Sequence, residues 1–142
     1  MNVLLSIKPK YVEEIKKGNK KYEFRKTGFR KKCLKEAYIY STSPVKKIVG
    51  FFKIEKIIED HPENLWENFK EYSGIAEDEF FDYFRNKEKG YAIEINEFEI
   101  FNDPIDPASI IPNFVAPQSF RYININELNS TDFITLDHFK SK

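Results

Sequence analysis

The sequence predicts an α+β domain, a small and partly closed β-barrel with short helices at its rim. Three observations support this fold class. The 142 residues fit one domain with its own core. Most of the chain reads as short strands, and helical spacing is confined to three brief stretches. The resulting order is β-α-β-β-β-α-α-β with a last short strand, whereas a doubly wound sheet requires strands and helices in regular alternation.

The first elements are a buried strand and an amphipathic helix. The run NVLLSI (2–7) has the apolar continuity of a short buried strand. Residues 9–18 predict a helix, because Pro9 suits its first position and Gly18 suits the left-handed position that follows its last turn. The next segment predicts a strand, which is discussed below with its charges.

The middle of the chain predicts strands joined by a basic loop. Residues 27–35 form that loop, and strands follow over 36–42 and 46–59. Gly50 lies inside the longer strand. A glycine at such a position indicates a bulge or a close approach of another backbone.

Two helices and another strand follow. Aromatic and aliphatic residues recur at helical spacing in 62–73, where they include Trp66 and Tyr72, and again in 76–87. At this spacing Trp66 is expected in the core rather than as a stacking platform for a base. Alternation returns over 91–101, and its phase slips at Asn96-Glu97, which predicts a bulge.

The C-terminal part is a proline-rich loop, a final strand and a polar tail. The loop covers 102–117, and QSFRYINI (118–125) predicts the strand. We therefore expect one domain over 1–125, followed by a polar C-terminal tail over 126–142.

Charge is distributed unevenly, although the chain has a net charge of zero. Residues 8–35 hold twelve Lys and Arg against three Glu, and residues 59–106 hold fifteen Asp and Glu against four Lys and Arg. The basic segment suits an anionic partner such as a nucleic-acid backbone. Alternatively, the two segments neutralise each other in the fold.

Several classes of function lack support in the sequence. The chain has one cysteine, Cys33, and no group of Cys and His with the spacing of metal ligands, so we expect no metal and no cofactor. No signal peptide is evident and no apolar run has the roughly 18 residues of a membrane span, which predicts a cytoplasmic protein without membrane contact.

The most informative stretch is KKGNKKYEFRK (16–26). It contains G-x-K-x-x-E-x-R, formed by Gly18, Lys20, Glu23 and Arg25. Arg25 offers a planar fork for a phosphate or a base edge, Glu23 can hold that fork, and Lys20 leaves the turn as a mobile cation. The competing interpretation is a solvated strand face stabilised only by cross-strand charge pairs.

The chain resembles the ASCH family, which is related to the PUA, EVE and YTH domains. The resemblance rests on LLSIKPKYVEEIKKGNKKYEFRK, on AYIYSTSP followed by KKIVGFFKIEKI, and on the late PQSFRY, so that it covers roughly residues 3–123. It implies a PUA-like β-barrel that binds RNA or a nucleotide, with a single-stranded or modified base in a basic cleft.

The resemblance also implies the residues of that cleft. They come from the motif, the first strand, a neighbouring strand and the last strand, and they are Lys20, Glu23, Arg25, Ser6, Lys8, Tyr40, Ser41, Gln118, Ser119 and Arg121.

Two alternatives to pure binding stay open. Some ASCH proteins are amidohydrolases of acylated cytidine, in which a lysine acts with a threonine and a later glutamate. Lys20 matches that lysine, but Glu23 stands at the threonine position, so Lys20 and Glu23 are candidate catalytic residues of a hydrolase of a modified nucleoside or RNA. The candidates for the later glutamate are Glu59, Glu63 and Glu79. The other alternative is an adaptor that binds a protein through the acidic helices within 62–87.

Overall fold

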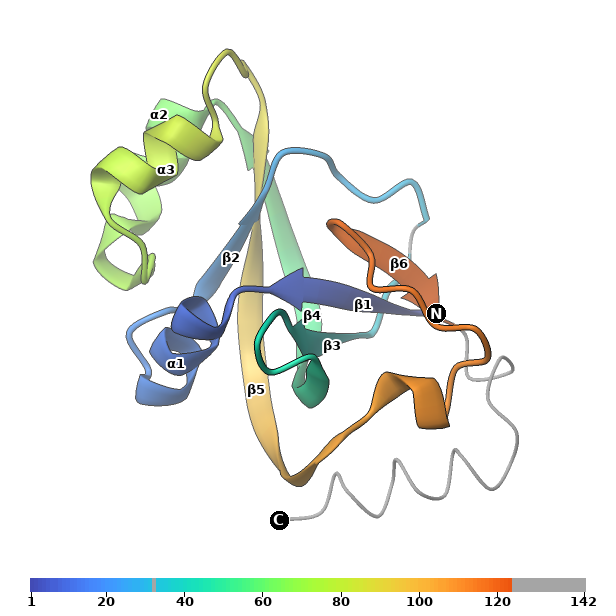
Figure 1. Cartoon of the computed structure of the whole chain (residues 1–142). Coiled ribbons are helices and arrows are strands. Elements are labelled where there is room, and N and C mark those ends of the chain that lie inside the picture. The colour runs from blue at the N-terminus through green and yellow to red at the C-terminus, as the bar shows by residue number, and fades with distance from the viewer. Residues whose placement is uncertain (32, 124–142) are drawn as a thin grey trace. The chain divides into compact units, whose positions relative to one another are not determined.

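The computed structural model describes residues 1–31 and 33–123 of the chain (Figure 1). These residues form two compact units, one built from 1–9, 33–53 and 97–123 and the other from 10–31 and 54–96. The elements of the described chain are, in order, β1 (Asn2–Ile7), α1 (Pro9–Lys17), β2 (Tyr22–Arg25), β3 (Glu36–Ser41), β4 (Lys47–Asp60), α2 (Pro62–Phe69), a 3-10 turn η1 (Lys70–Tyr72), α3 (Glu77–Tyr83), β5 (Gly90–Ile105), a second 3-10 turn η2 (Pro107–Ser109) and β6 (Phe120–Ile123).

The strand order within the described chain is β2-β5-β4-β3-β1-β6. Strand β1 pairs in parallel with β3 and antiparallel with β6, whereas β3 pairs antiparallel with β4 and β2 antiparallel with β5. The α+β class and the predicted order of elements are therefore confirmed. The predicted tail over 126–142 lies outside the described residues.

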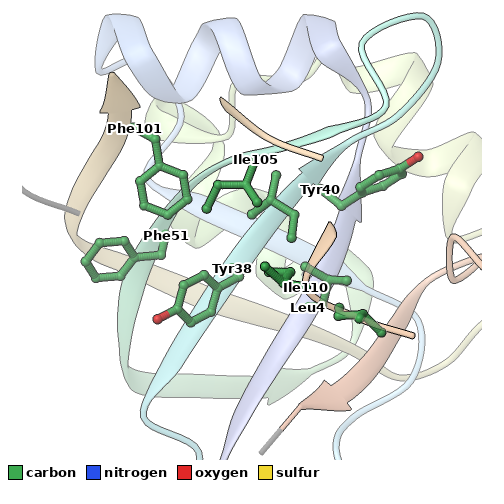
Figure 2. Packing of buried hydrophobic residues seen from close by; sticks show 9 residues of the cluster. Leu4, Tyr38, Tyr40, Phe51, Phe101, Ile105 and Ile110 are labelled. Carbon is green, nitrogen blue, oxygen red and sulfur yellow. The ribbon is translucent and has the colours of Figure 1, made fainter. Parts of the chain in front are cut away.

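The first unit packs around aliphatic side chains and tyrosines from several strands. Figure 2 shows this cluster, in which Leu4, Tyr38 and Phe51 lie among isoleucines that come from β5 and from the segment after it. The rings of Tyr38 and Phe51 stack with centroids 5.5 Å apart. Burial of apolar area at roughly 25 cal/mol per Å² makes such a cluster the main source of the unit's stability.

Gly50 in β4 confirms both features predicted for a glycine inside a strand, which are a bulge and a close approach of another backbone. The β3–β4 register shifts between Ile39 and Tyr40, which is a bulge. A Cβ atom built on Gly50 would lie 2.3 Å from the backbone oxygen of Glu99, so no larger residue fits without movement of the backbone.

The second unit packs around aromatic residues of α2, α3 and β2. Figure 1 shows α2 and α3 side by side. Phe24 of β2 meets Phe80 edge to face at 5.0 Å, and Tyr22 lies 4.3 Å from the ring of Phe69. Trp66 is buried in this same cluster, which confirms the core interpretation of that residue.

Both predicted helices of the second unit are shorter than their sequence pattern indicated. Helix α2 ends at Phe69, whose φ of −125° leaves the α region, and the chain continues as a 3-10 turn. Tyr72 belonged to the predicted apolar face and is instead 46% exposed. Helix α3 spans only Glu77–Tyr83, because Phe84 has left helical geometry and Asn86 has a φ of +62°. No helix of the described chain has the length and apolar character needed to cross a membrane.

Candidate functional site

The predicted motif residues Lys20, Glu23 and Arg25 come together in the second unit at the start of β2. Helix α1 ends in a tight turn, in which Gly18 has a φ of +83° and the amides of Asn19 and Lys20 both donate to the carbonyl of Glu14. Strand β2 is then held against β5, with Arg25 opposite Tyr91. The turn and the strand pairing fix the backbone on which the three charges stand.

These three charges are buried, which corrects the expectation of a mobile Lys20 and also excludes the competing interpretation of a solvated strand face. Lys20 is 3% exposed, Glu23 7% and Arg25 6%. One carboxylate oxygen of Glu23 lies 2.8 Å from a guanidinium nitrogen of Arg25, and the other lies 3.6 Å from Lys20 Nζ. Glu23 thus bridges two cations, and this bridging explains why the fold tolerates charges that strand alternation alone would leave in solvent.

Burial has a direct electrostatic consequence for Lys20. Loss of solvent lowers the pKa of its ammonium group, and the charge of Glu23 raises it in part. The ammonium also lies 5.1 Å from the centroid of the Phe24 ring and 5.4 Å from that of Tyr11. Arg25 and Glu23 also act on Tyr83, whose pKa is raised mainly by its own burial.

Lys20 also fastens a distant turn of the chain. Its Nζ donates to the carbonyl of Ser73 at 2.9 Å, and the two residues form an isolated β-bridge. The next amide, Lys21 N, donates to Tyr72 O at 2.8 Å. Gly74 packs closely against the lysine, because a Cβ atom added at this glycine would lie 2.4 Å from Lys20 Cβ. We call the contacts of Lys20 with Ser73 and Gly74 the lysine latch.

The exposed lysines beside the buried pair of cations meet tyrosine rings. Lys21 Nζ lies 4.3 Å from the centroid of Tyr72, and Lys26 Nζ lies 4.7 Å from that of Tyr83. Just before β2 the buried Lys20 is followed by the exposed Lys21, and at the end of β2 the buried Arg25 is followed by the exposed Lys26. Each buried cation therefore holds the backbone beside an exposed lysine that lies over an aromatic face.

The other predicted site residues belong to the first unit. The register places Ser6 of β1 opposite Tyr40 of β3, and the amide of Ser6 donates to the carbonyl of Ser119 at 2.9 Å. Ser6 Oγ donates to the carbonyl of Pro117 at 2.7 Å. In Figure 2 the hydroxyl of Tyr40 points away from the other labelled side chains of the cluster. The structure therefore brings together Ser6 of β1, Tyr40 of β3 and Ser119, the residue that precedes β6.

The remaining predicted residues of this unit differ in exposure. Ser41 is 2% exposed, whereas Lys8 and Gln118 are exposed and Arg121 is half-buried opposite Leu4.

No signal in the sequence indicated that the motif has as its neighbours Tyr72, Ser73, Gly74 and Tyr83. These residues lie roughly 50 or more positions away from it, and no local pattern links them to β2. Two of the glutamates considered for catalysis have partners elsewhere. Glu79 accepts hydrogen bonds from Lys10 Nζ and Tyr11 OH, and Glu59 forms an ion pair with Lys89. Within the described residues, no three His, Cys, Asp or Glu side chains gather as a metal site.

Comparison with known proteins places the chain among relatives of known fold. A family model described as "Domain of unknown function (DUF365)" matches residues 1–118. The chain is 28% identical over 130 residues to the "ASCH domain-containing ribonuclease" of Zymomonas mobilis, an alignment that covers 87% of this chain and 85% of the relative. It is also similar to a crystal structure of ASCH from that organism, with a TM-score of 0.83 at 27% identity over 95% of this chain and 94% of the other. A tyrosine-to-phenylalanine mutant of ZmASCH gives the same score and identity, and 97% of that chain is covered.

Proposed function

The chain belongs to the DUF365 family and is an ASCH domain, and from this premise we propose that it binds single-stranded RNA through exposed lysines paired with tyrosine rings. The observation that carries the proposal is the Lys21–Tyr72 pair, in which both side chains are accessible and the ammonium lies 4.3 Å from the ring centroid. A relative named a ribonuclease supports RNA as the partner.

The chemistry of such a pair suits an unpaired nucleotide. Tyrosine rings stack on bases and contribute about 1–3 kcal/mol per base, and a lysine ammonium neutralises the adjacent phosphate. In a duplex the base faces are already stacked on each other, so this mode of binding favours a single strand. Lys21 lies in the basic segment 8–35. Most of the described lysines and arginines of that segment are exposed, which agrees with binding to an RNA backbone.

The buried motif has a supporting role in this proposal. Glu23 fixes Lys20 and Arg25, and these two residues hold the backbone that presents Lys21 and Lys26. Binding groups that are fixed in advance lose less entropy when the ligand arrives. Ser6, Lys8, Tyr40, Ser41, Gln118, Ser119 and Arg121 remain predicted contacts to RNA, and each can be tested by substitution.

The proposal is tested by fluorescence anisotropy with a labelled single-stranded RNA of roughly 12 nucleotides. Wild-type affinity should fall as salt is added, with a log–log slope of about 0.7 for each phosphate contact. Tyr72→Ala should weaken binding by about 5- to 100-fold, the loss of one stacking contact. Lys21→Ala should weaken binding and reduce the salt slope by about 0.7, the loss of one phosphate contact.

The matched control is Lys89→Ala, which removes an exposed lysine that pairs with Glu59. It should bind RNA like wild type, since its loss affects no tyrosine pair of the proposed site. A flat salt response, or equal affinity of Tyr72→Ala and wild type, would contradict the proposal.

A second candidate is cleavage of the bound RNA, which the name of the Zymomonas mobilis relative favours. Lys20 is the candidate residue, because its buried ammonium has a lowered pKa and so gives up a proton more readily than an ordinary lysine. The same RNA, incubated with protein and separated on a denaturing gel, decides this point. Fragments with wild type that are absent with Lys20→Met, at protein concentrations adjusted so that each variant binds the same fraction of the RNA, would support catalysis. The amidohydrolase reaction is not proposed, because Glu23 offers no hydroxyl group and its two oxygens face Arg25 and Lys20.

A further inference from the structure

A hollow of about 490 Å³ lies in the second unit between helix α1 and residues 70–79. Its volume falls within the range of small-molecule sites. None of the residues that the family resemblance assigns to the basic cleft lines it. Its wall combines the ring of Tyr11 and the apolar side chains of Ile75 and Ala76 with charged and amide groups. A planar ligand with a polar edge suits a lining of this kind.

One side of the hollow presents an acceptor beside a donor. Asn19 Nδ2 donates to Glu14 Oε1 at 3.1 Å, so the carboxylate and the amide stand next to each other. Cytosine and adenine carry an amino donor beside a ring-nitrogen acceptor, which is the complementary arrangement. Uracil has a carbonyl oxygen where cytosine has the amino group, and it would place that oxygen against the carboxylate.

The charges of the lining favour a base over a free phosphate. Glu14, Glu71 and Glu79 contribute three carboxylates, whereas Lys10 and Lys70 contribute two ammonium groups. A phosphate group inside would meet net negative charge, which repels it. A neutral base can occupy the hollow while a lysine at its edge contacts the backbone of the nucleic acid.

The walls of the hollow are held in place by contacts already described. The lysine latch fixes Ser73 and Gly74, which line it. The turn after α1 fixes Asn19, because its amide donates to the carbonyl of Glu14. On the opposite side Glu79 accepts from Tyr11 OH at 3.4 Å. A hollow whose walls are fixed before binding can discriminate between bases of similar size.

We propose that this hollow receives one unpaired cytosine or adenine base, with its amino group on Glu14 and its ring against Tyr11. The inference rests on the proposed RNA binding and specifies a base preference for it.

The test uses cytidine and uridine 5′-monophosphate in separate calorimetric titrations. Cytidine monophosphate should bind at least about tenfold more tightly than uridine monophosphate, because uracil leaves the carboxylate facing an acceptor. Glu14→Ala should remove this preference. Glu13→Ala is the matched control: Glu13 is the neighbouring residue of the same helix and pairs with Lys16 three residues later, as Glu14 does with Lys17. The control should keep the preference.

A variant that fills the hollow gives an independent readout. Ala76→Trp should abolish binding of cytidine monophosphate, and its thermal melt verifies that it is folded. Equal binding of both mononucleotides, or an unchanged preference in Glu14→Ala, would overturn the inference.

RNA of mixed sequence separates this inference from the proposed function. If that RNA binds while both mononucleotides bind equally weakly, the base pocket is wrong and RNA binding stands. If neither RNA nor mononucleotide binds, both proposals fail.

Discussion

Helix α1 and strand β2 carry similar charges but place them in opposite environments. On α1, Glu13 pairs with Lys16 at 3.2 Å, with the glutamate side chain 56% exposed. On β2, Glu23 pairs with Arg25 at 2.8 Å, with both side chains under 10% exposed. The charges of the exposed pair are solvated by water whether or not they pair, so the pair stabilises the fold little. The buried charges have no water to replace a lost partner, so removal of one partner leaves the other charge without compensation.

Glu23→Gln is the strongest test of this difference. The substitution keeps the shape of the side chain but leaves Lys20 and Arg25 as two buried cations without a counter-charge. We expect a loss of about 3–5 kcal/mol in the free energy of unfolding, measured by urea titration with a fluorescence readout. Glu13→Gln on α1 should change it by about 0.5 kcal/mol or less. Losses of equal size in the two variants would show that the burial of Glu23 has no energetic consequence.

Two glycines with positive φ sharpen the comparison at the backbone. Gly74 has a φ of +64° and touches Lys20, whereas Gly18 has a φ of +83° and nothing within 4 Å of an added Cβ. Alanine at either position costs about 1–2 kcal/mol for the left-handed conformation. Gly74→Ala also forces the lysine latch apart, which adds about 1–3 kcal/mol. Thermal melts of both variants measure the difference, and an equal shift in Tm would show that the latch is loose.

The pH dependence of stability gives the smallest and most specific effect. Burial lowers the pKa of Lys20 below its ordinary value of 10.5. Between the lowered pKa and 10.5, the unfolded chain binds more protons than the folded chain, so the cost of burying Lys20 decreases as the pH rises through this window. Lys20→Met has no titrating group at this position, so its stability lacks this dependence on pH.

The comparison of Lys20→Met with wild type isolates that term. The free energy of unfolding of wild type, minus that of the variant, should therefore rise as the pH increases towards 10.5, as measured by urea titrations at several pH values. A constant or falling difference would contradict a lowered pKa for the lysine.

The contrast between α1 and β2 also shows how far a sequence determines its structure. Strand 2–7 and the helix from Pro9 were predicted almost to the residue, because apolar continuity and helix-terminal signals are local. The burial of Glu23 and Arg25 was not predicted. Alternation divides a strand into two faces, but the elements that cover each face decide which is solvated, and here both faces are covered.

The candidate site divides in the same way. The motif indicated that Lys20, Glu23 and Arg25 act together, since residues two or three apart near a strand are close in any fold. Ser73 and the hollow beside α1 could not be found, because Lys20 and Ser73 are 53 residues apart and meet only through tertiary packing. The helical pattern that reached Tyr72 failed for a related reason: the periodic spacing continues after the helix has ended at Phe69.

The lysine latch also has a consequence for the order in which the chain matures. A ribosome releases the N-terminal part of a protein first, at roughly 5–20 residues per second. Lys20 therefore emerges seconds before Ser73, the residue whose carbonyl it will bind. During that interval its ammonium and the carboxylate of Glu23 are solvated, and the hollow beside α1 lacks its opposite wall. The dehydration of these two charges therefore has to wait until the segment that contains Ser73 has been synthesised.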